Sequence, residues 1–231
     1  MLVFTGLITA VLAISGVTMA ILDRLAKHAR FAEMRLAPPV TMRASEAERM
    51  KLNAVNSALS AVLVYGGFLA MYPVLFASEA APWWVAGLQG VAILAVYDLL
   101  YYALHRGMHH KKVMRLIHRV HHQARNPTAK DSLWVHPAEL IAGLLTLMLS
   151  TGVVSLAAPI DTAGFILAFF AYSEMNLFIH SGVQFRGPLA VFNTVTRGHY
   201  GHHMMNINRN FGSLTPLWDI VFRTHLRIDL G

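Results

Sequence analysis

Two short segments of the sequence carry the same arrangement of histidines. The first, H-R-V-H-H, ends at His122, and the second, H-Y-G-H-H, ends 81 residues later at His203. In an α-helix, positions i, i+3 and i+4 share one face, so the three imidazoles of each segment are expected to point to one place. Imidazole nitrogens are common metal ligands, so each segment predicts three metal ligands. The histidines concerned are His118, His121, His122, His199, His202 and His203.

Three further histidines stand at the ends of long apolar stretches. His105 and His109 form an i, i+4 pair, and His180 closes a later stretch. With the two segments they bring nine imidazoles to one edge of the apolar region, and buried imidazoles without a shared partner would leave many polar nitrogens unsatisfied. A metal supplies that partner. Because one ion takes about four to six ligands, nine imidazoles predict two metal ions.

The other histidines fit ordinary roles. A lone histidine is usually a surface residue or has its own polar partner, which suits His28, His110 and His225. His136 is different, because it directly precedes Pro137 and stands three residues before Glu139. It either adds a tenth metal ligand or caps the helix that follows, and the sequence leaves both possibilities open.

The ligand set narrows the chemistry of the metals. The chain has no cysteine, which excludes disulfides, thiolate ligands and iron–sulfur clusters held by this chain. Imidazole suits zinc, copper, iron and nickel, but a structural zinc needs only about four ligands in a closed shell. A two-metal site beside apolar surface instead indicates activation of O₂ against an unreactive C–H bond of a lipid. Iron is the expected metal.

Five stretches almost free of charge must position these histidines. Each is close to the ~20 residues that a helix needs to cross the ~30 Å hydrocarbon core of a bilayer. With 55% hydrophobic and only 13% charged residues, the chain is predicted to be an all-α, multi-pass membrane protein with about five spans. The stretches are residues 1–22, 52–78, 80–97, 140–160 and 162–179, the last of which contains Glu174.

The lysines and arginines predict how the chain crosses the membrane. Seven lie within 24–51, seven within 106–130 and five within 186–227, which accounts for all 19. With five spans and the N-terminus outside, these basic segments and all the histidine segments fall on one side, and the positive-inside rule makes that side cytoplasmic. Residues 1–22 could instead be a cleaved signal peptide, but no basic region precedes them, so a retained helix is favoured.

The rest of the chain shows no flexible linker or low-complexity tract, so one membrane domain over residues 1–231 is expected. Residues 23–36 mix charged and apolar side chains at helical spacing, which predicts a helix on the membrane surface. Ser45 and Glu48 match a capping box at the start of the second span. The net charge of +7 follows mostly from topology, and no basic stripe with interleaved aromatics indicates nucleic-acid binding.

The chain resembles the fatty acid hydroxylase/sterol desaturase superfamily of membrane di-iron enzymes over about residues 97–224. Six segments carry the resemblance in order: D-L-L-Y-Y-A-L-H-R-G-M-H, H-R-V-H-H, H-P-A-E, I-H-S-G, H-Y-G-H-H and N-F-G-S-L-T-P-L-W-D. By this resemblance His105 and His109 form the HxxxH box, the two repeated segments are the HxxHH boxes, and His180 is the isolated ligand between them.

The resemblance also implies a fold. A helical membrane stalk would carry a cytoplasmic helical cap with the metals between them, residues 1–96 supplying N-terminal spans and a surface helix, and 97–224 the catalytic region. One position departs from the family pattern. The segment W-D-I-V-F-R-T has Arg223 where the family commonly has glycine, which leaves the local turn there open.

Asp98 and Glu174 are carboxylates within predicted spans, where a charge is costly and usually functional. Asp98 precedes His105 by seven residues and so lies on nearly the same helix face. We expect it to accept an imidazole N–H, so that the other ring nitrogen faces a metal, although pairing with Arg106 or a tyrosine is an alternative. Glu174, six residues before His180, invites the same interpretation.

A few polar residues have less specific expectations. Asn206 could bond a ligand histidine or cap a helix. Tyr101, Tyr102 and Tyr172 either line a substrate channel or simply pack within the membrane.

These features predict a di-iron oxygenase that uses O₂ and two external electrons to hydroxylate a lipid C–H bond, or alternatively to desaturate the lipid. Relatives in the superfamily act on fatty acyl chains, sterols or hopanoids, carotenoids and ether lipids, and the sequence does not choose among them. Because no flavin or nicotinamide fingerprint appears, the electrons are expected from a separate ferredoxin, cytochrome b5-like protein or reductase. A basic face would suit an acidic donor or anionic lipids.

Two other classes of protein remain as alternatives. A histidine-rich metal transporter or metal-binding protein would place polar ligands along a path near the bilayer midplane. A haem cytochrome with two axial histidines would pair them between spanning helices. The histidine segments lie at the ends of the predicted spans, which favours the oxygenase over both.

Overall fold

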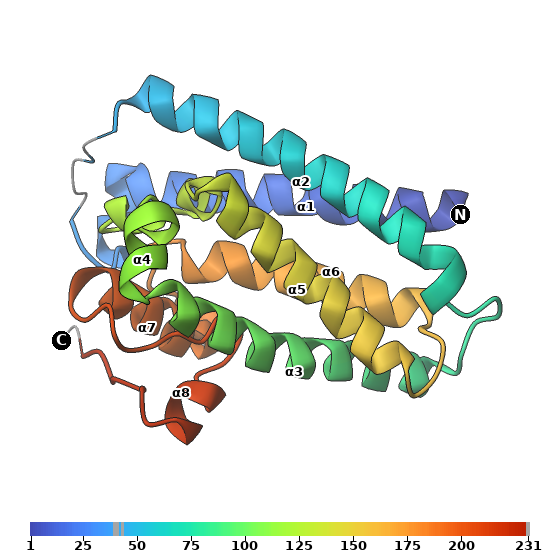
Figure 1. Ribbon diagram of the computed structural model, residues 1–231. Helices are drawn as coiled ribbons and strands as arrows, with labels where there is room; N and C mark the ends of the chain where they lie inside the picture. Colours follow the sequence, from blue (N-terminus) through green and yellow to red (C-terminus); the bar gives the residue numbers. More distant parts are fainter. Residues whose placement is uncertain (39–41, 43, 230–231) are drawn as a thin grey trace.

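Five long helices make up most of the protein. The computed structural model describes residues 1–38, 42 and 44–229. The long helices are α1 (Leu2–Lys27), α2 (Glu46–Leu75), α3 (Trp83–Met108), α5 (Pro137–Ser155) and α6 (Thr162–Ile179). Each is long and apolar enough to cross a membrane, which confirms the five predicted spans. They lie lengthwise in one bundle (Figure 1).

Short helical pieces join the long ones. They are η1 (Ala29–Met34), α4 (Lys111–Val113), the π-helical turn η2 (Met114–His118), η3 (His121–Gln123), η4 (Ala129–Leu133), η5 (Gly187–Phe192), α7 (Asn193–Met204) and α8 (Leu217–Val221). We call residues 109–136 and 180–229 the cap. In Figure 1, α4, α7 and α8 gather at one end of the bundle, and the N-terminus lies at the other end. The described chain is thus a helical stalk with a helical cap.

The start of α2 follows the predicted capping box. Ser45 Oγ accepts a hydrogen bond from the Glu48 backbone N–H at 3.3 Å, and Glu48 Oε2 accepts one from the Ser45 N–H at 2.8 Å. Because these bonds satisfy N–H groups that have no partner within the helix, α2 begins at Glu46, ahead of the uncharged stretch.

The predicted surface helix over 23–36 is wrong as one continuous element. Residues 23–27 extend α1, and the chain then breaks at His28, whose backbone is extended with φ −74° and ψ 131°. The Arg30 backbone N–H donates to His28 Nδ1 at 3.2 Å, so the imidazole starts the separate short helix η1. His28 is thus the N-cap of η1, and the extended backbone at this residue separates η1 from α1, so the helical spacing does not give one helix.

Glycine lets α3 and α6 approach each other closely. A Cβ atom at Gly164 would lie 2.5 Å from the Ala86 carbonyl oxygen, and one at Gly90 would lie 2.9 Å from the Gly164 carbonyl oxygen. Small residues at such crossings are typical of membrane helices, where close backbone contact replaces hydrophobic association. This contact fixes α3, which carries His105, relative to α6, which ends beside His180.

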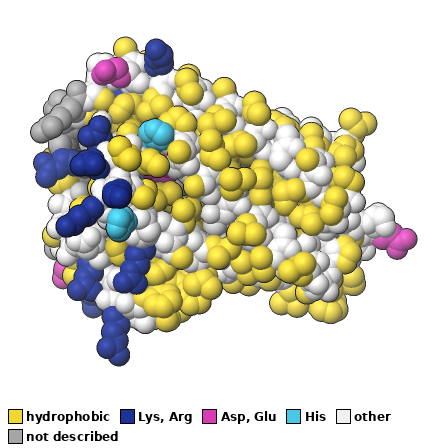
Figure 2. Space-filling model, in the orientation of Figure 1, with side chains coloured by type: hydrophobic (Ala, Val, Ile, Leu, Met, Phe, Trp, Pro, Cys, Tyr) yellow, Lys and Arg dark blue, Asp and Glu magenta, His cyan; other side chains and the backbone are white. Residues whose placement is uncertain are grey.

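Side chains divide the surface of the protein into two regions. Figure 2 shows apolar side chains over the length of the bundle and lysine and arginine side chains gathered at the cap end. At the opposite end Trp83 and Trp84 are exposed at the start of α3. An apolar belt with a basic end and aromatic residues at the other end is typical of membrane proteins.

Candidate metal centre

All nine histidines predicted as ligands meet where the stalk joins the cap, and they form two groups. Within each group, one candidate ligand atom per residue lies within 4.8 Å of every other. The first group contains His105, His109, His118, His122 and His202, and the second group contains His121, His180, His199 and His203. Either group could hold one metal ion.

Each HxxHH box divides between the two groups, which corrects the expectation of a three-ligand face. His118 and His122 belong to the first group, whereas His121 between them belongs to the second. In the other box the middle histidine, His202, joins the first group. In the second box the α-helix contributes to the division, because the neighbouring residues His202 and His203 of α7 point about 100° apart.

The two boxes lie on different local structures. The second box lies on the regular helix α7, as expected. The first does not continue one α-helix, because η2 ends as a π-helical turn at His118 and η3 begins at His121. Single π-helical turns occur frequently at functional sites, where they redirect side chains. Here the turn places His118 beside His105 of α3.

Distances between ring nitrogens fit shared ions. In the first group the Nε2 atom of His118 lies 3.2 Å from that of His105, 3.1 Å from that of His109 and 3.1 Å from that of His122. Two nitrogens bound ~2.1 Å from one ion at tetrahedral or octahedral angles lie about 3.0–3.4 Å apart. The spacing is therefore that of ligands on a common metal.

The second group has the same spacing. The Nε2 atom of His121 lies 3.2 Å from the Nε2 atoms of both His180 and His203, and that of His203 lies 3.1 Å from that of His199. The rings of His122 and His203 stack with centroids 4.5 Å apart, so the two groups share a wall. Among the described residues, His202 Nε2 is buried and has no hydrogen-bond partner, so this nitrogen is available as a ligand.

Outer ring nitrogens of several histidines donate to oxygen atoms of the protein. His105 Nδ1 lies 2.8 Å from the backbone carbonyl oxygen of Phe211. His180 Nδ1 lies 2.6 Å from that of Asn176, and His202 Nδ1 lies 2.6 Å from that of Arg209. A carbonyl only accepts, so each Nδ1 carries the proton and leaves Nε2 free to bind a metal.

Glu139 contacts a candidate ligand, a contact that the sequence did not reveal. Its Oε1 atom accepts from His118 Nδ1 at 2.9 Å, and the carboxylate is buried on the first turn of α5. The only sequence signal was its place in H-P-A-E, three residues after His136. A carboxylate behind a ligand imidazole fixes the ring and increases its basicity.

Asp219 was also missed as a contributor to the site. It stands in the segment L-T-P-L-W-D on α8 and is buried. Its carboxylate accepts from the backbone N–H groups of Phe211 at 2.8 Å and Gly212 at 2.7 Å, and from Thr224 Oγ1 at 2.7 Å. Because the Phe211 carbonyl accepts from His105, Asp219 fixes a loop that orients a candidate ligand.

Burial keeps the cap histidines neutral. It lowers the pKa of the His122 imidazole to about 3 and that of His180 to about 4, from the ordinary value of 6.5. The pKa values of His199 and His203 also lie well below 6.5, first because of burial and then because of neighbouring histidines. Near neutral pH these rings carry no extra proton, so a metal need not displace one.

Among the described residues Asp98 and Glu174 contact no imidazole, unlike the expectation from the sequence. Asp98 Oδ1 accepts from the Leu214 backbone N–H at 3.0 Å and Oδ2 from Thr215 Oγ1 at 2.6 Å, so it anchors a cap loop to α3. Glu174 Oε1 accepts from Ser15 Oγ at 2.8 Å and joins α6 to α1. Both carboxylates are paired across elements, and helix-face spacing alone did not identify their partners.

Two other predicted residues also lie outside both groups. His136 takes the second of its two expected roles, since the Ala138 backbone N–H donates to its Nδ1 at 3.1 Å and it caps α5. Asn206 is exposed, and its Oδ1 accepts from the Asn208 backbone N–H at 3.0 Å.

A cavity of about 50 Å³ borders the histidines on their stalk side. Two of the tyrosines singled out in the sequence line it, Tyr101 and Tyr172, together with rings of His121 and His180. Tyr102 instead packs under the cap, where its ring stacks on Phe222 with centroids 5.2 Å apart. The region beside the metal groups therefore contains hydroxyl groups as well as apolar side chains.

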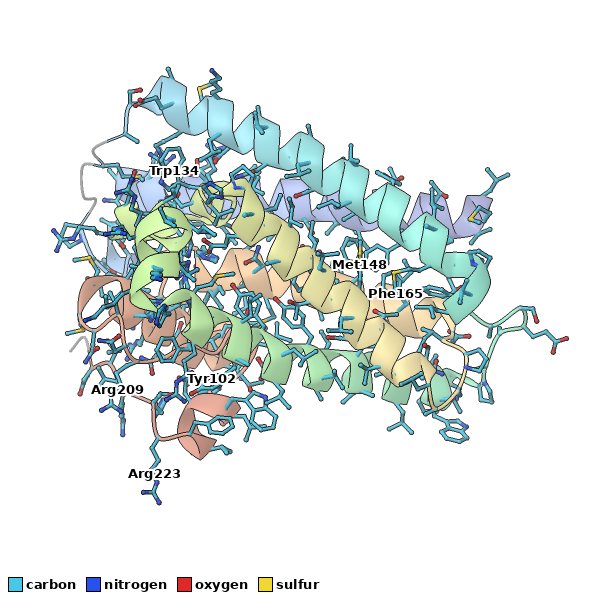
Figure 3. All side chains as sticks on the ribbon, in the orientation of Figure 1. Tyr102, Trp134, Met148, Phe165, Arg209 and Arg223 are labelled. Atoms are coloured by element: carbon cyan, nitrogen blue, oxygen red, sulfur yellow. The ribbon has the colours of Figure 1, made fainter. Side chains whose placement is uncertain are left out.

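The turn at Arg223 is now defined. Its φ is +59°, in the left-handed region that favours glycine, which is the residue common there in the family it resembles. Its carbonyl oxygen accepts from an Arg209 guanidinium N–H at 2.7 Å. Figure 3 shows the Arg223 side chain pointing away from the cap.

The chain is similar in sequence to several proteins that are named as lipid monooxygenases, oxidases or hydroxylases. Methylsterol monooxygenase 1 of Rattus norvegicus is 32% identical over 64% of this chain and 50% of its own length. Lathosterol oxidase of Mus musculus is 31% identical over 56% and 42%, and a fatty acid hydroxylase of Mycosarcoma maydis is 31% identical over 59% and 33%. The chain spans half or less of the length of these relatives. No solved structure matches it.

The match to a protein family covers the whole site. The sequence model described as fatty acid hydroxylase matches residues 90–224, more than half of the chain. This range contains all nine histidines of the two groups, as well as Glu139 and Asp219. The chain belongs to the fatty acid hydroxylase family.

Proposed function

We propose that the protein is a membrane-bound di-iron oxygenase that uses O₂ and two external electrons to hydroxylate a C–H bond of a lipid. The observation that carries the proposal is the division of nine histidines into groups of five and four at the end of a membrane-spanning bundle. In the overall reaction one oxygen atom of O₂ enters the lipid. The other takes up two electrons and two protons and leaves as water.

The donor set fits two irons. Imidazole nitrogens suit iron, and groups of five and four ligands leave coordination positions open at an ion that takes about six. When bound, the irons would supply the activation of O₂. We assign the first iron to His105, His109, His118, His122 and His202, and the second to His121, His180, His199 and His203.

The chain itself positions and encloses the reaction. Glu139 and the carbonyls of Phe211, Asn176 and Arg209 hold ligand rings in one orientation. Nearly all the ligand rings are buried, which keeps bulk water from the metals. Excluding water prevents the loss of a reactive oxidant to side reactions.

The position of the site argues against metal transport. The histidines lie together at the ends of α3 and α6 and in the cap, whereas a transporter would place ligands along a path near the bilayer midplane. The names of the relatives support a hydroxylase, because two of the three are a monooxygenase and a hydroxylase. The name lathosterol oxidase leaves desaturation as the alternative reaction on the same site.

The electron donor is proposed to dock at the basic end. Lysine and arginine side chains gather at the cap end of the bundle (Figure 2), which is also the end that holds the two histidine groups. By the positive-inside rule this end faces the cytoplasm. An acidic ferredoxin, cytochrome b5-like protein or reductase would be attracted to it, and the attraction would weaken with added salt.

Metal analysis and lipid mass spectrometry together test the function. The purified protein should contain two irons per chain and show no haem absorption. Lipid extracts from cells that express the gene should contain a species with one additional oxygen atom, whereas loss of two hydrogen atoms would identify a desaturase instead.

One variant for each metal group sharpens this test. His121→Ala and His202→Ala should each abolish lipid oxidation and reduce bound iron. His110→Ala is the matched control, because His110 is exposed and lies outside both groups. Near-normal turnover in either His121→Ala or His202→Ala would contradict the proposal.

A further inference from the structure

A groove of about 330 Å³ opens on the side of the bundle between α1 and α2. Its lining comes from both of these helices and from α5, α6 and η4. α1 packs mainly on α6 and α2 mainly on α5, so the two helices make little contact with each other. The groove therefore lies in the part of the surface that would face lipid.

Small side chains on α1 and α2 leave the groove open. Gly16 of α1 and Ser57 of α2 are exposed at its rim, and Ser60 and Ala61 line the next turn of α2. Larger side chains at these positions would fill the space between the two walls. The opening thus depends on a few residues that contact neither metal group.

The groove continues to the candidate metal centre. Four residues, Ser132, Leu140, Tyr172 and Asn176, line both the groove and the 50 Å³ cavity beside the histidines. That cavity is bordered by His121 and His180 of the second group. It is also bordered by Glu139, which holds His118 of the first group.

The inner end has a buried polar atom without a partner. Glu139 Oε2 is buried and makes no hydrogen bond within the described residues, while Oε1 binds His118. Such an atom is costly unless another group satisfies it at some stage. A hydroxyl group or a water beside the metals is the kind of partner that it would accept.

A larger groove elsewhere on the bundle does not reach the site as directly. It has a volume of about 580 Å³ and is lined by α3, α6 and residues 191–195 and 214–218. Its inner residues border only a cleft of about 20 Å³ that touches one ligand, His199. The hydrogen bonds of Asp98 to Leu214 and Thr215 fix the loop across its inner end.

We propose that an apolar segment of a membrane lipid reaches the metal centre sideways from the bilayer, through the groove between α1 and α2. The proposal rests on the proposed lipid oxygenation and specifies the route and binding site of the substrate. The chain or ring system of the lipid occupies the groove, and the carbon to be oxidised lies in the small cavity between Tyr172 and His121.

Photolabelling of the protein in lipid nanodiscs tests this route. The probes are palmitic acid with a diazirine at its methyl end and cholesterol with a diazirine, and the labelled residues are identified by peptide mass spectrometry. At least one probe should label the inner residues Tyr172 or Asn176. Ala61→Trp should reduce this labelling about tenfold or more, which corresponds to ~1.4 kcal/mol of binding. Labelling by the palmitic acid probe alone would indicate an acyl substrate, and labelling by the cholesterol probe alone would indicate a sterol.

Matched variants keep the test decisive. Ser57→Trp fills the exposed rim of the same groove and should have the same effect even if Ala61→Trp folds poorly. Ala95→Trp, which fills the larger groove on α3, should leave the labelling unchanged. Inner labelling that persists in both Ala61→Trp and Ser57→Trp, is lost in Ala95→Trp, or is absent with both probes would overturn the route.

This test fails separately from the test of the function. Labelling needs neither bound iron nor turnover. A protein that binds two irons and hydroxylates lipid, but is not labelled through this groove, would retain the proposed function and lose the route. A protein labelled as expected that contains no iron would lose the function alone.

Discussion

In four of the candidate ligands, His105, His118, His180 and His202, the two ring nitrogens have separate tasks. The inner nitrogens of a group lie 3.1–3.2 Å apart in several pairs, and several outer nitrogens donate to oxygen atoms. Three of these oxygens are backbone carbonyls, whereas the partner of His118 is the Glu139 carboxylate. A side chain can be exchanged without disturbing the backbone, so Glu139 offers direct access to the outer contact of a ligand.

We predict that Glu139→Ala weakens iron binding about 10–100-fold, the usual effect of removing a partner behind a metal ligand. Glu139→Gln should weaken it less, because an amide oxygen still accepts from His118 Nδ1. Iron titration of the metal-free protein measures both affinities. Glu174→Gln is the control, because Glu174 is also a buried carboxylate in the stalk but binds Ser15. Equal iron affinities in wild type and Glu139→Ala would contradict this assignment.

Arg223 gives a prediction about stability. A side chain in the left-handed region costs about 1–2 kcal/mol, and glycine avoids this cost at some expense in the entropy of the unfolded chain. Since Arg223 has φ +59°, Arg223→Gly should increase stability by roughly 0.5–1 kcal/mol. Thermal unfolding in detergent measures the change. Arg209→Gly should not increase stability, because Arg209 donates to the Arg223 carbonyl.

At the scale of elements, the contact between α3 and α6 sets the distance between the supports of the two metal groups. Gly164→Ala would place a Cβ atom 2.5 Å from the Ala86 carbonyl oxygen, and backbone on both sides cannot easily move. We expect a loss of roughly 1–3 kcal/mol in stability, as in other overpacked contacts.

Thermal unfolding and iron content check this prediction. Gly152→Ala in α5 is the matched control, since nothing lies within 4 Å of a Cβ atom there. Alanine has a higher helix propensity than glycine, so Gly152→Ala should stabilise the protein slightly. Equal melting temperatures for Gly164→Ala and wild type would show that α3 and α6 need not touch.

Elements were predictable from the sequence where one physical term dominates. Hydropathy alone decides the five spans, and a local hydrogen-bond pattern decides the start of α2 at Ser45 and Glu48. The nine histidines were identifiable because so many imidazoles at one edge require a common partner. Their division into two groups was not, since it depends on the π-helical turn before His118 and on the relative positions of α3, α6 and α7.

Tertiary partners could not be predicted from spacing along one helix. Asp98 lies on nearly the face of His105, yet it binds the backbone of Leu214, more than a hundred residues later. Glu139 and Asp219 gained their roles in the same way, through segments that only the folded cap brings close. Helical periodicity shows which residues share a face, but not which distant loop meets that face.

At the scale of the whole molecule, the two metal groups connect the first part of the cap to the last. The first group joins His105 and His122 to His202, and the second joins His121 to His203, which lie 82 residues apart. Each metal would therefore close a long loop that contains α5 and α6. Both closures occur at the same end of the bundle.

In a chain without cysteine, these metals would act as cross-links. Closing a loop of this length removes freedom from the unfolded chain worth roughly 4–5 kcal/mol by the entropy argument used for disulfides. Chelation of iron should thus loosen the cap first. Limited trypsin digestion should then cut within 106–130 and 186–227 faster than in the iron-loaded protein, and cleavage within 24–51 should change little.

Restoring Fe(II) should return both cap regions to slow cleavage, and identical digestion rates with and without iron would show that packing alone holds the cap. If iron slows the cleavage as predicted, the bonds between the histidines and the irons have two consequences. The same ions that would activate oxygen would also link the cap to the stalk, so loss of iron would loosen the cap as well as stop the proposed reaction.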